Sequence, residues 1–376
     1  MSQRSRNIKM FSLDDFNFKE DPIGALKQMI GESPTRKEQQ EANLLNYKKG
    51  EISFYAFVHD YDEVASLYNM IYDKHFNIYT LPNGYFEKIF VGGNNIANFE
   101  CVLDLSSLIL LQQITIQYDL EYNSKFIIPI SLQTLLKEAK IKEETSTPSL
   151  LYQSVVDSVV IKYEDSTKTP LWNLICNLLS WIDTYCEVKI VEDKLNAGNS
   201  IQTMSFSTQS DSVFLATHGG LLITEDKVWQ TKMFNAFPSM SVSNWLHMRK
   251  YKFADKFAEQ MIGCGNFGLP MTSQYIVEQY KALALNKDNT YSLCMTNIEV
   301  NPFVYPKVLE AGRKILADIN TPESISAVIN MFVILFKSMT QDTASLICYK
   351  EMLVPQNSMY ISCLQDALKI AHPIIV

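Results

Sequence analysis

The sequence predicts an α/β domain at about residues 98–240 with a short parallel sheet, flanked by a helical region at residues 1–95 and a helical domain at residues 241–376. Two observations support this fold class. Short apolar runs without polar alternation recur in the central segment, and such runs are typical of strands that are buried on both faces. Segments of helical length separate these runs, and strand–helix alternation is the pattern of a parallel sheet with crossover helices.

The overall composition is that of an ordinary globular protein. The 376 residues are 47% hydrophobic and 20% charged, so there is enough apolar material for two or three domains. The formal net charge is −8 and the pI is about 5.3. Such a surface does not attract nucleic acid as a whole. Any contact with nucleic acid would therefore need a local basic patch.

The N-terminal region is predicted to hold two helices. The first begins near Thr35, where Thr35 and Glu38 have the spacing of a capping box, and it ends near Lys49, just before Gly50. The second covers residues 62–75, where apolar side chains form a broad face.

The central segment alternates between strands and helices. Predicted strands cover 101–104, 126–128, 187–191 and 221–223. Predicted helices cover 106–116, 131–140, 149–162 and 171–186, and a further helix opens at Asp211 and ends at Gly219.

After residue 241 the helical pattern returns. Thr321 is a favourable N-cap residue and Pro322 suits the first helical position. Apolar residues then recur at helical spacing, so a core-facing helix is expected there.

Cysteine usage and the absence of a long apolar run favour a cytoplasmic protein. The seven cysteines are widely spaced, with no CxxC pair, which argues against a disulfide framework or a zinc site. Residues 1–9 are polar and basic, so no signal peptide is expected. The longest uncharged stretch, residues 260–277, contains three glycines and a proline and does not suit a membrane span.

Acidic residues follow two of the predicted strands. Asp104 ends the first strand, Asp226 lies just past the strand at 221–223, and Asp211 opens the preceding helix. Ligands of open α/β sheets bind beyond the carboxyl ends of the strands. Carboxylates that meet there repel one another unless a cation neutralises them, and oxygen ligands suit Mg²⁺ or Mn²⁺. The sequence therefore predicts a metal site formed by Asp104, Asp211 and Asp226.

The same motifs resemble the PIN family of nucleases. The resemblance covers about 140 residues and rests on three stretches, 102–108, 128–138 and 211–216 running into 222–226. It implies a PIN-like three-layer domain that holds divalent metal and cuts RNA. Asp104, Asp211 and Asp226 take the places of the family's metal-binding aspartates. Thr224 matches the hydroxyl residue that usually precedes the last of them by two positions.

Two features depart from the family pattern. The family's glutamate falls near Leu135, which is apolar, and Glu138 lies three residues later, about one helical turn further along. The helix from Asp211 to the Thr-x-Asp motif is also shorter by about three residues. Glu138 is therefore a candidate fourth ligand, and the alternative is a solvated surface position.

Each acidic residue also has a structural interpretation. Asp104 could cap a helix after its strand, Asp226 could belong to a turn or a helix cap, and Asp211 could be an N-cap residue.

Trp245 lies close to the most basic local cluster outside the N-terminal segment. An aromatic residue beside cations is typical of single-stranded RNA binding. An amphipathic helix with a solvated charged face is the alternative. The basic residues are Arg249, Lys250, Lys252 and Lys256.

Two functions from different classes follow from these patterns. The first is a metal-dependent ribonuclease, with DNA as an alternative substrate. The second is a catalytically inactive PIN-like scaffold in a protein-interaction or regulatory module, which the apolar Leu135 and the acidic charge favour. A homo-oligomer or a regulatory protein partner is compatible with either function.

Overall fold

The structure is a computed structural model of the chain, which forms two compact units, Met1–Ile52 and Ser53–Val376. It describes residues 42–43, 45–47, 49, 51–57, 63–72, 76–82, 85, 99–145, 150–153, 158–161, 169–191, 207–232, 238–319, 321–354 and 356–373.

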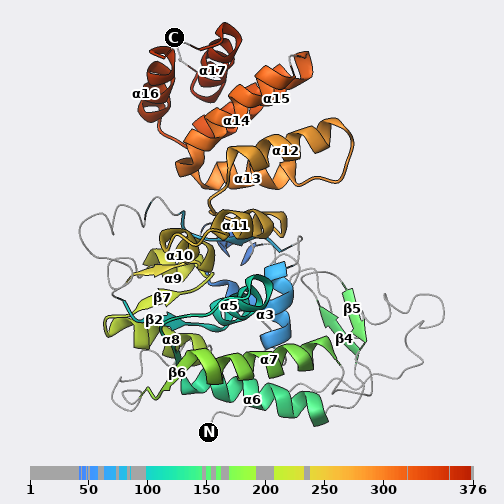
Figure 1. The fold of residues 1–376 in the computed structure, drawn as a ribbon, viewed down its shortest axis with the longest axis vertical. Coiled ribbons are helices and arrows are strands. Elements are labelled where there is room, and N and C mark those ends of the chain that lie inside the picture. The colour runs from blue at the N-terminus through green and yellow to red at the C-terminus, as the bar shows by residue number, and fades with distance from the viewer. Residues whose placement is uncertain are drawn as a thin grey trace, which may run out of the picture. The chain divides into compact units, whose positions relative to one another are not determined.

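The second unit contains a five-stranded parallel sheet with helices around it (Figure 1). Its strand order is β6-β3-β2-β7-β8, and each neighbouring pair is parallel. The predicted α/β class with a small parallel sheet in a largely helical chain is therefore confirmed. The strands are β2 (Cys101–Leu103), β3 (Phe126–Pro129), β6 (Cys186–Lys189), β7 (Leu221–Ile223) and β8 (Ser239–Met240).

Helices connect these strands and pack against the sheet. Because the apolar runs of β3 and β7 are buried along their whole length, both faces of these strands must be covered. Helix α8 contacts β2, β3 and β7, whereas α5 contacts β2 and packs against α7. The helices are α5 (Leu105–Tyr118), α6 (Ile130–Thr145), α7 (Pro170–Tyr185), α8 (Ser207–Thr217) and α9 (Lys227–Lys232).

One hydrophobic cluster fixes α8 and α9 on the sheet. It joins side chains from three neighbouring strands to side chains of both helices, and burying such groups is the main favourable term in folding. Its members are Val102, Ile127, Leu222, Val213, Ala216 and Trp229.

Two predictions for the central segment are wrong. The described residues of the segment 149–162 are not helical, because β4 (Leu150–Gln153) and β5 (Ser158–Ile161) pair there as antiparallel strands. The run Val159-Val160-Ile161 is β-branched, which favours a strand. The helix expected to open at Asp211 begins at Ser207, so Asp211 lies in its second turn.

The segment before the sheet contacts the C-terminal side of the chain. The 3-10 helix η2 (Phe54–Phe57) and α3 (Glu63–Tyr72) come first, and α3 matches the helix predicted at 62–75. Strand β1 (Ile78–Tyr79) then pairs in parallel with β9 (Asn266–Phe267). In the first unit, residues 42, 43, 45–47 and 49 are helical, whereas the predicted cap at Thr35 lies outside the described residues.

Apart from β9, the described chain after β8 consists of helices and their connections, as predicted. Thr321 caps α15 through a capping box with Ser324, and Pro322 occupies the first turn. Helix α12 packs on α14, α13 on α15, and α15 on α17. The helices are α10 (Val242–Met248), α11 (Ala254–Gly263), α12 (Ser273–Ala284), α13 (Tyr291–Val300), η6 (Pro302–Val304), α14 (Tyr305–Asp318), α15 (Pro322–Lys337), α16 (Gln341–Met352) and α17 (Ser358–Ala371).

Candidate functional site

The strand order creates a topological switch point between β2 and β7. From β2 the chain continues to β3 and β6 on one side, and it later returns to β7 and β8 on the other side. In open α/β sheets, ligands bind in the crevice beyond the carboxyl ends of the strands at this point. Asp104 directly follows β2, and Thr224, Glu225 and Asp226 directly follow β7. This edge of the sheet is therefore the candidate site.

Asp104 is enclosed by hydrogen-bond donors. It caps α5, and its side chain is 1% exposed. Oδ1 accepts hydrogen bonds from Ser106 Oγ at 2.7 Å and Ser107 N at 2.9 Å. Oδ2 accepts from Thr224 Oγ1 at 2.6 Å and Tyr55 Oη at 3.2 Å. Burial raises the pKa of Asp104, although these hydrogen bonds act against that shift.

Asp226 is buried and caps the start of α9. Oδ1 accepts a hydrogen bond from Val228 N at 3.0 Å, which is the contact that an N-cap residue makes. Oδ2 accepts from Gln209 Nε2 at 3.2 Å and from Ser53 Oγ. Burial raises the pKa of Asp226 to about 6, and the nearby charge of Asp104 adds to this shift.

Thr224 connects the two aspartates. Its hydroxyl donates to Asp104 and accepts a hydrogen bond of 3.1 Å from Asp226 N. The hydroxyl has only one proton, which it donates to Asp104. Through this bond Thr224 links the end of β7 to the end of β2.

Glu225, which the sequence reasoning missed, is the third buried carboxyl group at this edge. Its side chain is 2% exposed, and its backbone N–H donates to Ser106 Oγ at 3.0 Å. Burial raises the pKa of Glu225 to about 8, and the negative charge of Asp104 contributes further. The sequence feature that could have identified Glu225 is its position between Thr224 and Asp226, just after a buried strand.

The segment Ser53–Phe57 lies against the carboxylates and supplies two of their donors. The Tyr55 side chain is fully buried, and its hydroxyl donates to Asp104 while accepting a hydrogen bond of 3.3 Å from Ser106 N. Ser53 Oγ donates to Asp226. Burial, and then the charge of Asp104, raises the pKa of Tyr55 well above its ordinary value. Tyr55 is 49 residues from Asp104, and Ser53 is 173 residues from Asp226, so no local sequence pattern links the members of either pair.

Asp211 lies at the same edge of the sheet but at a different strand. Its Oδ2 accepts a hydrogen bond of 2.6 Å from Ser131 Oγ. Ser131 follows β3, the neighbour of β2, so this contact places Asp211 beyond β3. The three predicted aspartates, Asp104, Asp211 and Asp226, therefore lie at one edge of the sheet. Asp211 is held there by its hydrogen bond with Ser131 of α6.

Glu138 lies on the exposed surface of α6. It follows Ser131 by seven residues, which is roughly 10 Å along the helix axis. Leu135, at the position of the family glutamate, is half-buried and apolar. Glu138 therefore lies at a solvated surface position, which was the alternative to its role as a fourth ligand.

The residues at the switch point do not fit a divalent metal ion. Oδ1 of Asp104 already accepts from three donors and Oδ2 from two, so hydroxyl and amide hydrogens face this carboxylate where a cation would have to bind. Across the described part of the chain, no group of three or more histidine, cysteine, aspartate or glutamate side chains is arranged to hold a metal. In the structure, hydrogen bonds satisfy the oxygens of Asp104 and Asp226.

Trp245 is a core residue, so its predicted stacking on RNA is wrong. Its side chain is 1% exposed and packs with Phe126 and Tyr251. The Arg249 guanidinium lies 5.7 Å from the ring centre, a cation–π contact inside the protein. The remaining basic residues, Lys250, Lys252 and Lys256, lie on the exposed surface.

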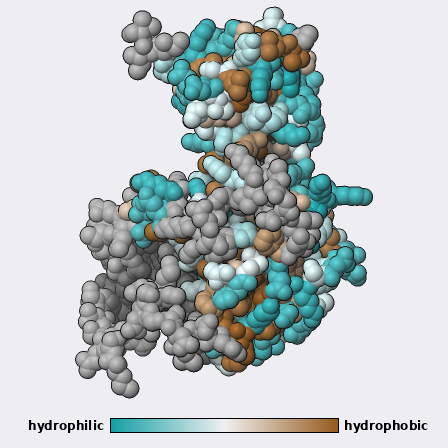
Figure 2. All heavy atoms as spheres, turned by 90° about the vertical axis from the view of Figure 1, so that its left-hand side faces the viewer, coloured by the Kyte–Doolittle hydropathy of each residue, from teal (hydrophilic) through white to brown (hydrophobic). Residues whose placement is uncertain are grey.

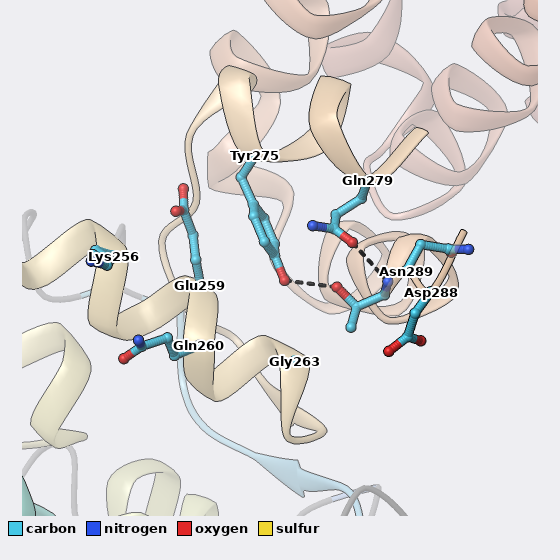
Figure 3. A pocket seen from close by; sticks show the side chains of 9 residues that line it. Lys256, Glu259, Gln260, Gly263, Tyr275, Gln279, Asp288 and Asn289 are labelled. Carbon is cyan, nitrogen blue, oxygen red and sulfur yellow. Dashed lines mark hydrogen bonds between the residues drawn. The ribbon is translucent and has the colours of Figure 1, made fainter. Parts of the chain in front are cut away.

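A separate pocket of about 330 Å³ lies between α11, α12 and the start of α13 (Figure 3). Tyr275 Oη and Thr290 Oγ1 are 2.8 Å apart, and Gln279 Oε1 accepts a hydrogen bond of 2.8 Å from Thr290 N. Glu259 accepts hydrogen bonds from the backbone and hydroxyl of Thr272. These groups join the three helices to one another.

None of the described helices is long and apolar enough to cross a membrane. Comparison of the chain with protein-family models, with curated proteins and with solved structures finds no match.

Proposed function

We propose that the central α/β domain is a PIN-like scaffold within a protein-interaction or regulatory module, and that its acidic edge is a structural centre. The observation that supports this proposal is the enclosure of Asp104, which is 1% exposed: Oδ1 accepts three hydrogen bonds and Oδ2 accepts two. A metal-dependent nuclease needs carboxylate oxygens that are open to the cation and the substrate.

The segment Ser53–Phe57 supports the same function. Tyr55 and Ser53 lie at the sheet edge where open α/β sheets bind ligands, and their side chains donate to Asp104 and Asp226. A buried polar network of this kind stabilises a unique fold when each member has a partner. The network thus joins the sheet to the segment that precedes it.

The second candidate function is a metal-dependent ribonuclease. The observation that favours it is the meeting of Asp104, Asp226 and Asp211 at one edge of the sheet. In addition, Gln209 Oε1 is buried without a hydrogen-bond partner beside Asp226, and an amide oxygen of this kind is a ligand for hard cations.

Metal binding and RNA cleavage distinguish the two functions. The parent chain, Asp104→Asn and the exposed control Glu138→Gln would be compared by thermal unfolding with and without Mn²⁺, and by incubation with structured and single-stranded RNA. For a scaffold, Mn²⁺ leaves the melting temperature of the parent unchanged and no variant cleaves RNA. Asp104→Asn lowers the melting temperature, because the N–H groups of the asparagine amide then face hydrogen-bond donors that need an acceptor. Glu138→Gln leaves the melting temperature unchanged.

The opposite pattern would establish the ribonuclease. A rise in the parent's melting temperature with Mn²⁺, together with RNA cleavage that Asp104→Asn abolishes and Glu138→Gln retains, rules out an inert centre.

A further inference from the structure

Helix α16 has two apolar faces, and one of them is exposed. Ala344, Ile347 and Cys348 are buried on the side that packs against α17. Leu346, Tyr349 and Leu353 recur at spacings of three and four residues, and they are 52%, 60% and 65% exposed. Since a helix turns 100° per residue, these three side chains form a stripe on the side opposite the buried face.

Two further apolar side chains are exposed at the end of the helix, beside Leu353. Met352 is 51% exposed and Val354 is 53% exposed, so five large apolar side chains are in contact with solvent within nine residues. The space-filling view shows hydrophobic side chains among hydrophilic ones on the surface of the C-terminal helices (Figure 2). Single exposed apolar residues are ordinary, whereas a contiguous patch marks an interaction surface.

The charges beside this stripe on one copy of α16 are complementary to those on a second, antiparallel copy. Exposed Asp342 lies one turn before Leu346, and exposed Lys350 lies one turn after it. The two charges are therefore separated by roughly 12 Å along the helix axis. When two copies of α16 lie antiparallel with Leu346 of each opposite Tyr349 of the other, Asp342 of each copy lies within about one turn of Lys350 of the other. A parallel arrangement instead places like charges together.

We propose that α16 is a homodimer contact in which two copies of this chain pack antiparallel through Leu346, Tyr349 and Leu353. A two-fold axis requires one surface patch to complement itself. The stripe meets this requirement when Leu346 of each copy packs on Tyr349 of the other, because Asp342 precedes Leu346 and Lys350 follows Tyr349. This interface is independent of the switch-point carboxylates, so the proposal holds whether or not that edge binds metal.

The first experiment measures self-association of the full chain by sedimentation equilibrium over a range of concentrations. The parent is expected to form a dimer, and Leu346→Asp is expected to abolish it, because the substitution places a negatively charged carboxylate from each copy in the apolar centre. Leu283→Asp is the control, since Leu283 is 42% exposed on α12. Circular dichroism confirms that each variant is folded.

Charge exchange tests the antiparallel arrangement. Asp342→Lys and Lys350→Asp each turn two attractive contacts per dimer into repulsive ones, so each is expected to weaken the dimer by about tenfold. The double variant Asp342→Lys/Lys350→Asp restores opposite charges at both contacts and is expected to recover most of the parent's affinity. Only pairing between copies of the same helix predicts this recovery.

A parent chain that is monomeric at its highest soluble concentration would overturn the proposal. So would a dimer that Leu346→Asp leaves intact, or a double charge variant as weak as the single variants. Binding of a different protein to the stripe of a monomeric chain would likewise replace the second copy as its occupant.

Discussion

Glu225 Oε1 accepts a hydrogen bond of 2.7 Å from Val242 N, at the first turn of α10. This bond connects the second residue after β7 with the helix that follows β8. A carboxylate at a helix N-terminus interacts favourably with the helix dipole. At Glu225 burial outweighs this effect, because the pKa is raised to about 8. The carboxyl group is therefore protonated in the folded chain over a pH range in which it ionises in the unfolded chain.

This shift predicts that the fold loses stability as the pH rises from about 5 to about 8. Between the ordinary pKa of 4.5 and the folded pKa of about 8, the folded state holds a proton that the unfolded state releases. The free energy of unfolding then falls with pH by about 1.4 kcal/mol for each pKa unit of the shift. Below the ordinary pKa this cost is absent, and above the folded pKa it is complete. Urea unfolding at a series of pH values measures it.

Glu225→Gln tests whether this residue causes the pH dependence. Glutamine keeps an oxygen for Val242 N and does not ionise, so stability should change less between pH 5 and 8. At pH 8 the variant is expected to be more stable than the parent. Glu187→Gln, on the exposed surface of β6, is the control and should keep the parent's slope. An unchanged slope in Glu225→Gln would contradict the assignment.

Thr224→Val is predicted to destabilise the fold by about 1–3 kcal/mol, because it removes a buried donor to Asp104 and leaves Asp226 N without its acceptor. Valine has nearly the same shape as threonine, so the change mainly removes the hydroxyl. Thr231→Val is the control, since Thr231 is exposed on α9 and its hydroxyl bonds within its own helix. Equal midpoints of urea unfolding for the two variants would disprove the structural link.

Tyr55→Phe is predicted to cost about 1–2 kcal/mol and to loosen the segment Ser53–Phe57 from the sheet edge. The variant loses the hydroxyl that donates to Asp104 and that accepts from Ser106 N. Hydrogen exchange of the Ser106 amide should accelerate, and urea unfolding gives the stability change. Tyr305→Phe, at a side chain that is 38% exposed, should alter neither quantity. Unchanged exchange at Ser106 in Tyr55→Phe would show that the hydroxyl does not hold this segment.

The strands of the central sheet could be predicted because their signal is local. The apolar runs at β2, β3 and β7 required burial on both faces, and a parallel sheet was the arrangement that provided it. A local signal alone also explains the wrong prediction at 149–162. The apolar residues there fit a helix or a strand equally well, and the pairing of β4 with β5 decides for strands.

The roles of the site residues depended on tertiary contacts. Asp104 and Asp226 were expected at the sheet edge, which follows from strand ends alone. Whether they face a cation or hydrogen-bond donors depends on Ser53 and Tyr55, which are far away in the sequence. Trp245 shows the same limit, because the sequence placed it beside basic residues and the fold buried it against Phe126.

Gly268→Ala is predicted to separate the β1–β9 pair and to cost more than about 2 kcal/mol. Gly268 has a φ angle of +89°, and an added Cβ would lie 2.2 Å from the carbonyl oxygen of Thr80. The backbone on one side must shift, which strains the 2.9 Å hydrogen bond from Thr80 N to Phe267 O. Gly263→Ala is the matched control, because its Cβ would meet only ordinary contacts at 3.8 Å and alanine favours the helix that ends there. The free energy of unfolding should therefore fall in Gly268→Ala and stay constant or rise in Gly263→Ala. If both variants match the parent, the β1–β9 contact does not contribute to the stability of the fold.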